Sequence, residues 1–225
     1  RDRLNRLRRG KRNLPLDTSN PFFDRDHNKC VLCGICVRTC AEIQGVNAIN
    51  FAFRGYDTLI STFADKPILD SRCESCGECV SRCPVGALVP KNYQRPSREV
   101  KSVCTYCGVG CNIHLGVRGD KVVGVRADRD NPVNEGSLCV KGRYAYEFIN
   151  HPDRLTTPLI KKDDDFIEGT WEEALDLVAD KLSGHKGSQF GALSSARTTN
   201  EDNYVFQKFV RSVMGTNNVD HCARL

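Results

Sequence analysis

The sequence predicts an α+β protein that combines two small cysteine-rich domains with the beginning of a parallel α/β domain. Three observations lead to this prediction. All of the thirteen cysteines except Cys222 fall into three tight groups, short β-branched segments lie between and after these groups, and from residue 158 apolar residues recur with helical period. The expected order is a basic strap (1–19), a first cysteine-rich domain (20–97), a second one (98–157) and an incomplete α/β domain (158–225).

The first two cysteine groups share one spacing, Cys-x2-Cys-x2-Cys-x3-Cys, and begin at Cys30 and Cys73. A duplicated run of this kind is the signature of two-cluster bacterial ferredoxins, in which the fourth cysteine of each run ligates the cluster of the other run. Residues 20–97 are therefore expected to form a two-cluster ferredoxin-like domain. One 4Fe-4S cluster should use Cys30, Cys33, Cys36 and Cys83, and the other Cys73, Cys76, Cys79 and Cys40. Ala41 replaces the proline that usually follows such a run, which affects the local turn but not the ligands.

The third group suits a third 4Fe-4S cluster, held by Cys104, Cys107, Cys111 and Cys139 in a small β-rich domain. Three ligands lie on one tight loop and the fourth returns after a hairpin. Glycines between the loop ligands leave positions without a Cβ, where backbone can wrap around a cluster. Lys141 follows two residues after Cys139, so its ammonium group can lie between this cluster and a neighbouring group.

Zinc is the alternative metal for Cys-x2-Cys pairs. A structural zinc ion takes four ligands from two separated pairs, and two complete four-cysteine runs do not divide in that way. Disulfides are disfavoured by the same tight spacing. Reduced thiolates instead indicate a reducing compartment, and we expect a cytoplasmic location.

Charge is concentrated at one end of the chain. The net charge is +5, from 33 basic and 28 acidic side chains, and residues 1–12 carry seven basic groups against one acidic group. This segment is interpreted as a solvated helix or strap and not as a nucleic-acid surface. The Arg8-Arg9 pair is not followed by the apolar region of an export signal, and no run of eighteen apolar residues predicts a membrane span.

Short strands and turns are predicted within the cysteine-rich domains. The expected strands cover residues 48–55, 58–63, 113–117 and 122–125, and residues 86–90 should close the ferredoxin-like domain. Gly55-Tyr56-Asp57 should form the first turn and Gly119-Asp120 a two-residue hairpin turn. Residues 144–149 are predicted to be a short helix. His114 alternates with apolar neighbours in a strand, which favours a structural histidine over a metal ligand.

The last part of the chain has the pattern of a strand–helix–strand unit. A capping box at Thr170 begins a helix whose buried face is expected to contain Trp171, Ala174, Leu175, Val178 and Leu182. A buried strand is predicted at 189–193. A second helix, capped at Thr199 and ended by Gly215 in the C′ position, should bury Val205, Phe206, Phe209, Val210 and Val213. The next strand begins at 217–220, so a βαβ unit and a parallel sheet are expected.

Several segments of the chain resemble the molybdenum- or tungsten-containing bis-pterin oxidoreductases, and most closely the catalytic subunit of formate dehydrogenase. They are residues 104–111, 139–143, 150–155, 195–204 and 215–225. The resemblance implies a molybdenum or tungsten bis-molybdopterin guanine dinucleotide cofactor, formate or carbon dioxide as substrate, and Lys141 as an electron relay between a cluster and one pterin. In this family a cysteine or selenocysteine metal ligand follows the position that matches Leu225. Cys222 matches no cluster position and is expected to be a buried thiol beneath the active site.

The ferredoxin-like part also resembles the large iron-sulfur subunit of respiratory complex I and its hydrogenase relatives. This resemblance implies flavin- or iron-sulfur-containing partner subunits, hydrogenase subunits or a ferredoxin. Because the chain begins at Arg1 and stops at Leu225 within a strand pattern, we expect it to be part of a longer polypeptide.

Three functions are compatible with these patterns. The favoured one is a formate dehydrogenase that passes electrons through three clusters. The second is an electron-transfer subunit of the complex I type without a catalytic metal, and the third is a zinc-stabilised binding module. The match at 195–225 favours the enzyme, because an inactive domain would not need the segment that leads to the metal ligand.

Overall fold

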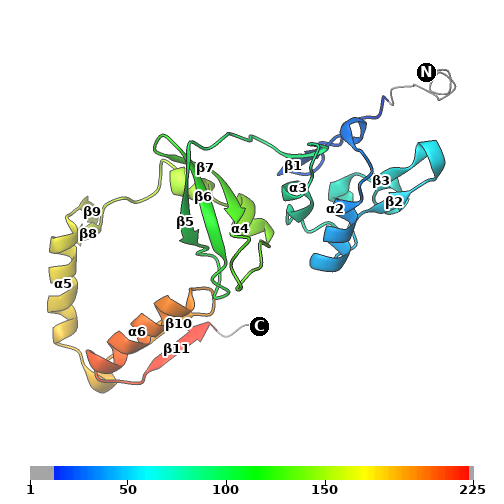
Figure 1. The fold of residues 1–225 in the computed structure, drawn as a ribbon. Coiled ribbons are helices and arrows are strands. Elements are labelled where there is room, and N and C mark those ends of the chain that lie inside the picture. Colours follow the sequence, from blue (N-terminus) through cyan, green and yellow to red (C-terminus); the bar gives the residue numbers. More distant parts are fainter. Residues whose placement is uncertain (1–12, 223–225) are drawn as a thin grey trace, which may run out of the picture. The chain divides into compact units, whose positions relative to one another are not determined.

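The computed structural model describes residues 13–222, so the basic segment 1–12 and residues 223–225 lie outside the described part. The chain divides into two compact units. The first unit contains Arg1–Lys101 and His114–Tyr146, and the second contains Ser102–Ile113 and Glu147–Leu225. Figure 1 labels the elements in chain order.

The ferredoxin-like half of the first unit is made of two antiparallel strand pairs and two short helices. Strand β1 (Phe23–Arg25) pairs with β4 (Leu88–Pro90), and β2 (Asn50–Ala52) pairs with β3 (Leu59–Ser61). Helices α2 (Ile35–Arg38) and α3 (Glu78–Ser81) each begin directly after a cysteine loop. The strands predicted within 48–55 and 58–63 are confirmed as the shorter β2 and β3, and a 3-10 helix at Gly55–Asp57 forms the expected turn.

The core of this half is small and is surrounded by sulfur. Its buried apolar residues come from β1, α2, β3, α3 and β4 and from two positions outside these elements, and six of the eight cysteines of the two runs pack against it as partly buried residues. The buried residues are Phe23, Val37, Ile49, Ile60, Ile68, Val80 and Leu88. A core of this size needs additional cross-links for stability, which metal clusters can supply.

Asp17 connects three separate segments of the ferredoxin-like half. Its carboxylate forms an ion pair of 2.8 Å with the buried guanidinium of Arg25, and it accepts hydrogen bonds from Ser19 and from the backbone N–H of Ile68. Burial raises the pKa of Asp17, but the hydrogen bonds from Ser19, Ile68 and Arg25 together outweigh it and lower the pKa to about 2. The carboxylate is therefore charged under all physiological conditions and holds the N-terminal segment to the core.

The second half of the first unit is built on the sheet β5-β6-β7. Its strands are β5 (Arg98–Val103), β6 (Asn112–Arg118) and β7 (Lys121–Ala127), followed by helix α4 (Val140–Tyr144). The predicted hairpin is confirmed, and Gly119 at its turn has a positive φ of 59°. His114 lies between the carboxylates of Glu99 and Asp128, at 3.9 and 3.6 Å, which agrees with a structural role.

The predicted helix at 144–149 is wrong in its position. Helix α4 begins at Val140, directly after Cys139, and ends at Tyr144, because the next residue, Ala145, has a non-helical ψ of 51°. A separate 3-10 helix follows at Glu147–Asn150. Cys139 is the N-cap residue without a side-chain hydrogen bond, and its carbonyl accepts the first intrahelical hydrogen bond, from the N–H of Arg143.

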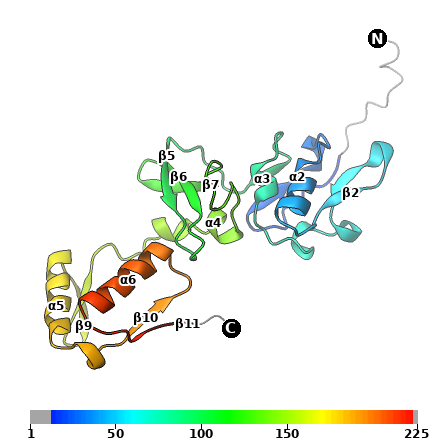
Figure 2. The ribbon, with the colours of Figure 1, turned by 60° about the horizontal axis from the view of Figure 1, so that its bottom comes forward.

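The second unit contains the strand–helix–strand unit that the sequence predicts. Strand β10 (Ala192–Ser195) pairs in parallel with β11 (Val219–Cys222), and helix α6 (Asn200–Ser212) connects them. Figure 2 shows α6 beside the two strands. Before this unit come a hairpin of β8 (Leu159–Lys162) and β9 (Asp165–Glu168), which the sequence patterns do not predict, and helix α5 (Trp171–Ser183).

The helix caps of the second unit are confirmed, but part of its expected core is exposed. Thr170 forms the predicted capping box, and Thr199 caps α6. The strand predicted at 189–193 begins later, at Ala192, and Gly215 lies two residues beyond the C-cap residue Val213, one position later than the expected C′ site. On α6, Val210 is buried, whereas no residue of α5 is buried and Trp171 is 67% exposed. A two-stranded sheet offers enough area to cover one helix and not two.

No helix in the described part of the chain is long and apolar enough to cross a membrane.

Replacing Asp17 with asparagine should destabilise the first unit by about 1–2 kcal/mol, because a charged acceptor shared by three segments is lost. The pKa of Asp17 is depressed from 3.8 to about 2, so its contribution is complete above pH 4 and is lost as the pH falls towards 2. The difference in the free energy of unfolding between variant and wild type should therefore stay constant from pH 5 to pH 8. Denaturant unfolding under anaerobic conditions measures this free energy, and substitution of the exposed Asp70 by asparagine is the control. A difference in unfolding free energy that changes between pH 5 and pH 8 would contradict the prediction.

Candidate iron-sulfur sites

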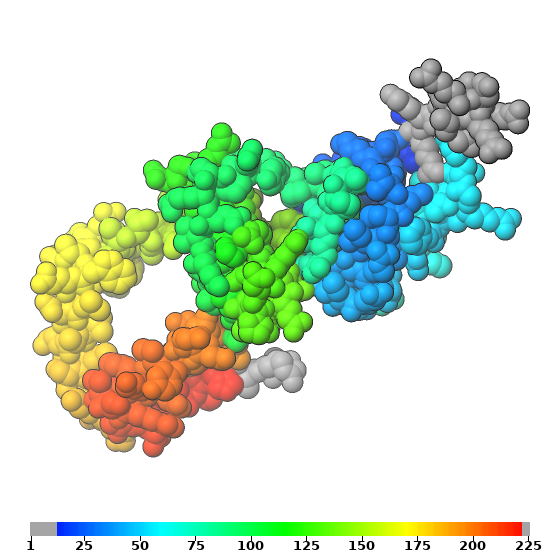
Figure 3. Space-filling model, viewed as in Figure 1, coloured from blue at the N-terminus to red at the C-terminus, as the bar shows by residue number. Residues whose placement is uncertain are grey.

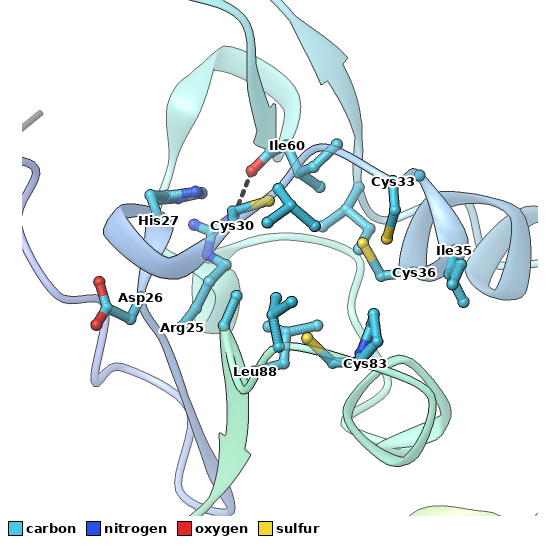
Figure 4. A pocket seen from close by; sticks show the side chains of 16 residues that line it. Arg25, Asp26, His27, Cys30, Cys33, Ile35, Cys36, Ile60, Cys83 and Leu88 are labelled. Atoms are coloured by element: carbon cyan, nitrogen blue, oxygen red, sulfur yellow. Dashed lines mark hydrogen bonds between the residues drawn. The ribbon is translucent and has the colours of Figure 1, made fainter. Parts of the chain in front are cut away.

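The cysteines of the first run lie around one cavity together with the last cysteine of the second run. Cys30, Cys33 and Cys36 come from the loop before α2 and from the helix itself, and Cys83 comes from the segment after α3. Figure 4 shows their side chains around the cavity, with Leu88 beside them. Much of the remaining lining is apolar and includes Ile35, Ile49, Ile60 and Leu88. The structure thus brings together the four cysteines that the crossed pattern predicts for one cluster.

A second cavity gathers the remaining four cysteines of the two runs. It is lined by Cys73, Cys76 and Cys79 of the second run and by Cys40, which ends the first run. Apolar residues from two other segments, including Ala48 and Ile68, complete its wall. The two cavities therefore exchange their fourth cysteine, in the way that the duplicated spacing predicts.

The two ligand loops have nearly the same backbone. Leu32 and Ser75, two residues after the first cysteine of each run, both have a φ of 56°, and each donates its N–H to that cysteine's sulfur over 3.4 Å. Gly34 and Gly77 then adopt φ values of 71° and 73°. Positive φ values at alternate positions fold the loop around a point inside it, so its sulfurs face a common space. The spacing of the runs is explained by this repeated turn.

Several of these thiols have raised pKa values. Burial, reinforced by the negative charge of Cys30, raises the pKa of Cys36 to about 11. Burial also raises the pKa of Cys73, Cys76 and Cys79, and at Cys76 a backbone hydrogen bond from Glu78 and the charge of Arg143 oppose the shift. Such thiols are protonated at neutral pH, so binding of iron has to displace their protons.

The arrangement fits a polynuclear cluster better than a single ion. Within residues 13–222, no group of three or more His, Cys, Asp or Glu side chains converges closely enough to hold one metal ion. Sulfurs that surround a cavity, instead of meeting at one point, suit a cluster that has a metal atom near each ligand. Bound clusters would be held by the cysteine sulfurs and would supply one-electron transfer.

The third group has three of its cysteines on one loop of the second unit, residues 104–111. The N–H of Cys104 donates to the carbonyl of Cys111 over 2.8 Å, and that of Gly110 to the carbonyl of Cys107 over 3.3 Å. Cys104 is buried, and Gly110 has a φ of 66° that closes the loop. Cys139, which belongs to the other unit, is exposed at the start of α4. Its membership of this ligand set stays a prediction.

The cysteine loop of the second unit lies against the connection between β10 and α6. A Cβ added at Gly108 would be 3.2 Å from the carbonyl oxygen of Thr198 and 3.4 Å from that of Ala196. The side chain of Tyr106 packs edge-on against Phe148, with ring centroids 6.1 Å apart. The carboxyl end of a parallel strand is where α/β domains bind their ligands, so the loop approaches the expected cofactor side of β10.

Lys141 lies on α4 and its side chain is exposed in the structure. Cys222 ends β11, where its backbone pairs with Ser195, and its side chain is outside the described part. The expected relay role of Lys141 and the expected burial of Cys222 therefore stay predictions.

A polar connection between the two halves of the first unit is not predicted by the sequence patterns. Glu78 and Arg143 form a buried ion pair, and Tyr144 stacks on Phe22 with ring centroids 4.8 Å apart. The one indication in the sequence is an acidic residue inside a ligand run, since Glu78 follows Cys76 by two residues. Spacing alone could not identify its partner 65 residues away.

Three family models match the chain in succession. The model for the NADH-quinone oxidoreductase subunit 3 ferredoxin-like domain matches residues 20–89. The model for the molybdopterin oxidoreductase Fe4S4 domain matches residues 97–151, and that for molybdopterin oxidoreductase matches residues 154–225. Residues 97–151 and 154–225 are therefore similar to two successive domains of molybdopterin oxidoreductases. The resemblance and the fold class that the sequence predicts are confirmed.

Known proteins that are similar to this chain carry several names. The chain is 39% identical to NADPH-Fe(3+) oxidoreductase subunit alpha of Geobacter sulfurreducens, over 91% of this chain and 24% of the relative. It is 37% identical to an NADH-quinone oxidoreductase subunit of Rhizobium meliloti, over 91% of this chain and 24% of the relative. A Staphylococcus aureus protein provisionally named as a formate dehydrogenase is 32% identical, over 91% of this chain and 26% of the relative. The chain thus spans about a quarter of the length of these relatives.

Two reciprocal substitutions test the crossed ligand sets. Cys40→Ala should abolish the paramagnetic signal of the cluster held by Cys73, Cys76 and Cys79, and Cys83→Ala should abolish that of the cluster held by Cys30, Cys33 and Cys36. Iron analysis and electron paramagnetic resonance of the reduced protein measure the losses. Loss of the first-run cluster in Cys40→Ala, with the second retained, would show that the sets are not crossed.

A glycine pair tests the packing around the second cavity. A Cβ at Gly77 would collide with the Tyr144 hydroxyl and lie 2.5 Å from Cδ of Arg143, whereas one at Gly86 would meet nothing within 4 Å. Both glycines have positive φ, at 73° and 67°, so both alanine variants carry a similar backbone strain of about 1–2 kcal/mol. Gly77→Ala should lose the iron of the second cavity, and Gly86→Ala should keep it. Equal iron contents in the two variants would contradict the packing argument.

Proposed function

We propose that this chain is the iron-sulfur portion of a formate dehydrogenase catalytic subunit, which interconverts formate and carbon dioxide and passes electrons through three 4Fe-4S clusters to a partner subunit. The observation that carries the proposal is the approach of Gly108 to the carbonyls of Ala196 and Thr198. It places a cysteine loop at the carboxyl end of β10, where an α/β domain binds its cofactor. The provisional name of the Staphylococcus aureus relative supports formate as the substrate.

The residues of the second unit suit the cofactor that the family implies. The backbone carbonyls of Ser195 to Thr198 and the N-terminus of α6, capped by Thr199, lie together at the end of β10. Helix N-termini favour anionic groups, so this end can bind a phosphate of a molybdopterin guanine dinucleotide. When bound, that cofactor supplies molybdenum or tungsten chemistry for the two-electron oxidation of formate. The chain's own residues hold the neighbouring cluster and position Lys141 after its last ligand.

The ferredoxin-like half is proposed to deliver electrons to a flavin- or iron-sulfur-containing partner, a hydrogenase subunit or a ferredoxin. Cys33 is exposed, and Val31 beside it is 60% exposed, so one edge of the first cavity faces solvent. The β2–β3 hairpin, cyan in Figure 3, exposes Phe51 and Phe53 on the same domain. Exposed apolar groups beside a redox site are suited to docking an electron-transfer protein.

A second candidate function is an electron-transfer subunit without a catalytic metal. The identity to the NADH-quinone oxidoreductase subunit of Rhizobium meliloti favours it. One experiment separates the two functions. The complete subunit is purified anaerobically, its molybdenum and tungsten are quantified, and formate-dependent reduction of an artificial dye is measured. Bound metal with formate oxidation supports the enzyme, whereas three clusters without either metal or formate oxidation would identify the electron-transfer subunit.

Replacing Lys141 with alanine in the complete subunit should slow reduction of the cluster held by Cys104, Cys107, Cys111 and Cys139 at least tenfold, with metal and iron content unchanged. Loss of a cation near this cluster should also lower its reduction potential. Arginine is not expected to restore the rate, because its planar fork is larger than a compact ammonium group. Rapid-freeze spectroscopy after mixing with formate measures the rate, with the exposed Lys121→Ala as control. Reduction at the wild-type rate in Lys141→Ala would exclude the relay role.

A further inference from the structure

A buried ion pair joins the ligand loop of the second cavity to the segment that contains Cys139. Glu78 is 1% exposed and Arg143 is 7% exposed, and both lie in the first unit. The guanidinium of Arg143 bonds the Glu78 carboxylate through one nitrogen and donates from Nε to the carbonyl of Cys76 over 2.8 Å. The same carboxylate oxygen accepts the N–H of Leu138 over 3.0 Å. The residue before Cys139 and the residue four after it are thus both fixed to the loop that carries Cys76.

The folding of the ligand loop does not require this pair. The equivalent position in the first run, two residues after Cys33, is Ile35, although the loops share their φ values and their N–H to sulfur bonds. Removing two charges from water costs several kcal/mol per ion, and an apolar pair of similar size is often at least as stable. The second run therefore differs from the first in carrying a costly polar group that the loop itself does not need.

The surroundings of the pair keep its charges close to the second cavity. Arg82 approaches the other Glu78 oxygen at 3.3 Å from a partly exposed position, so the carboxylate is bound on both sides. Tyr144 follows Arg143 and packs on Phe22, and its buried hydroxyl has no hydrogen-bond partner within the described residues. Because these side chains are closely packed, the guanidinium of Arg143 is held beside the carbonyl of Cys76. Its charge acts on the second cavity with little screening by solvent.

We propose that Glu78 and Arg143 are positioning residues that fix the Cys139 segment to the second ligand loop and set the reduction potential of the cluster held by Cys73, Cys76, Cys79 and Cys40. Reduction adds one negative charge to a cluster. A nearby cation stabilises the reduced form and raises its potential, whereas a nearby carboxylate lowers it. The proposal depends on cluster binding by these cysteines and not on formate as substrate.

Single and double substitutions in the complete, anaerobically purified protein test the proposal. Arg143→Gln should lower the potential of the second-run cluster and Glu78→Gln should raise it. At a fixed ambient potential each should change the ratio of reduced to oxidised cluster by about tenfold, which is about 59 mV for a one-electron couple. The double variant should return close to the wild-type potential, because both charges are absent. Redox titration followed by electron paramagnetic resonance measures each cluster.

Arg126→Gln is the matched control, because it removes a cation of the same unit that is bound by Glu99 and not by a ligand loop. It should leave the potential of the second-run cluster unchanged.

Shifts of the two single variants in the same direction, or no shift while iron is retained, would overturn the proposal. If both single variants lose iron, the double variant decides, since it leaves neither Glu78 nor Arg143 as an unpaired charge. A double variant that binds the second-run cluster at the wild-type potential supports the proposal. A double variant that lacks this cluster would show that the pair has a purely structural role and would reject the proposal.

Discussion

The packing of two cysteine loops around two cavities is the constraint on which the ferredoxin-like half depends. Its core has few fully buried apolar residues, and partly buried cysteines of both runs surround them. Each cavity draws its fourth cysteine from the other run, so neither loop can close its site alone. Clusters bound in this way would connect cysteines 33 to 53 residues apart, as disulfides connect distant segments in small extracellular domains. The strand pairs β1–β4 and β2–β3 are short because the cysteine loops take the place of a larger core.

The residues that pack against the cysteine loops differ chemically between the two units. In the first unit, charged and aromatic side chains of α4 pack against the second loop at Gly77, where no Cβ could fit. In the second unit, the loop 104–111 lies on backbone carbonyls between β10 and α6, again at a glycine. Glycine therefore stands at both of these places, where the ligand loop approaches another element closely.

Several elements of the fold follow from local sequence and others do not. The capping box at Thr170 and the turn at Gly119 are encoded by neighbouring residues, and both are found where the sequence predicts them. The helix after Cys139 begins four residues earlier than the sequence pattern predicts, and it has no side-chain cap that the sequence could have indicated. The sequence correctly predicts that α5 is a helix with an apolar face, but no residue of that face is buried in the structure. Burial depends on how much sheet is present to cover a helix, which periodicity does not specify.

The sequence by itself determined the grouping of the cysteines, because cluster ligands on one loop must have fixed spacing and a duplicated run implies an exchanged fourth ligand. It also determined the parallel βαβ unit, whose caps and apolar periods are local properties. Only the tertiary structure decided that Glu78 meets Arg143, that Tyr144 covers Gly77, and that Gly108 lies on the β10–α6 connection. These contacts join residues from 65 to 90 positions apart. Such pairs depend on the paths of whole segments through the fold, and residue spacing contains no information about them.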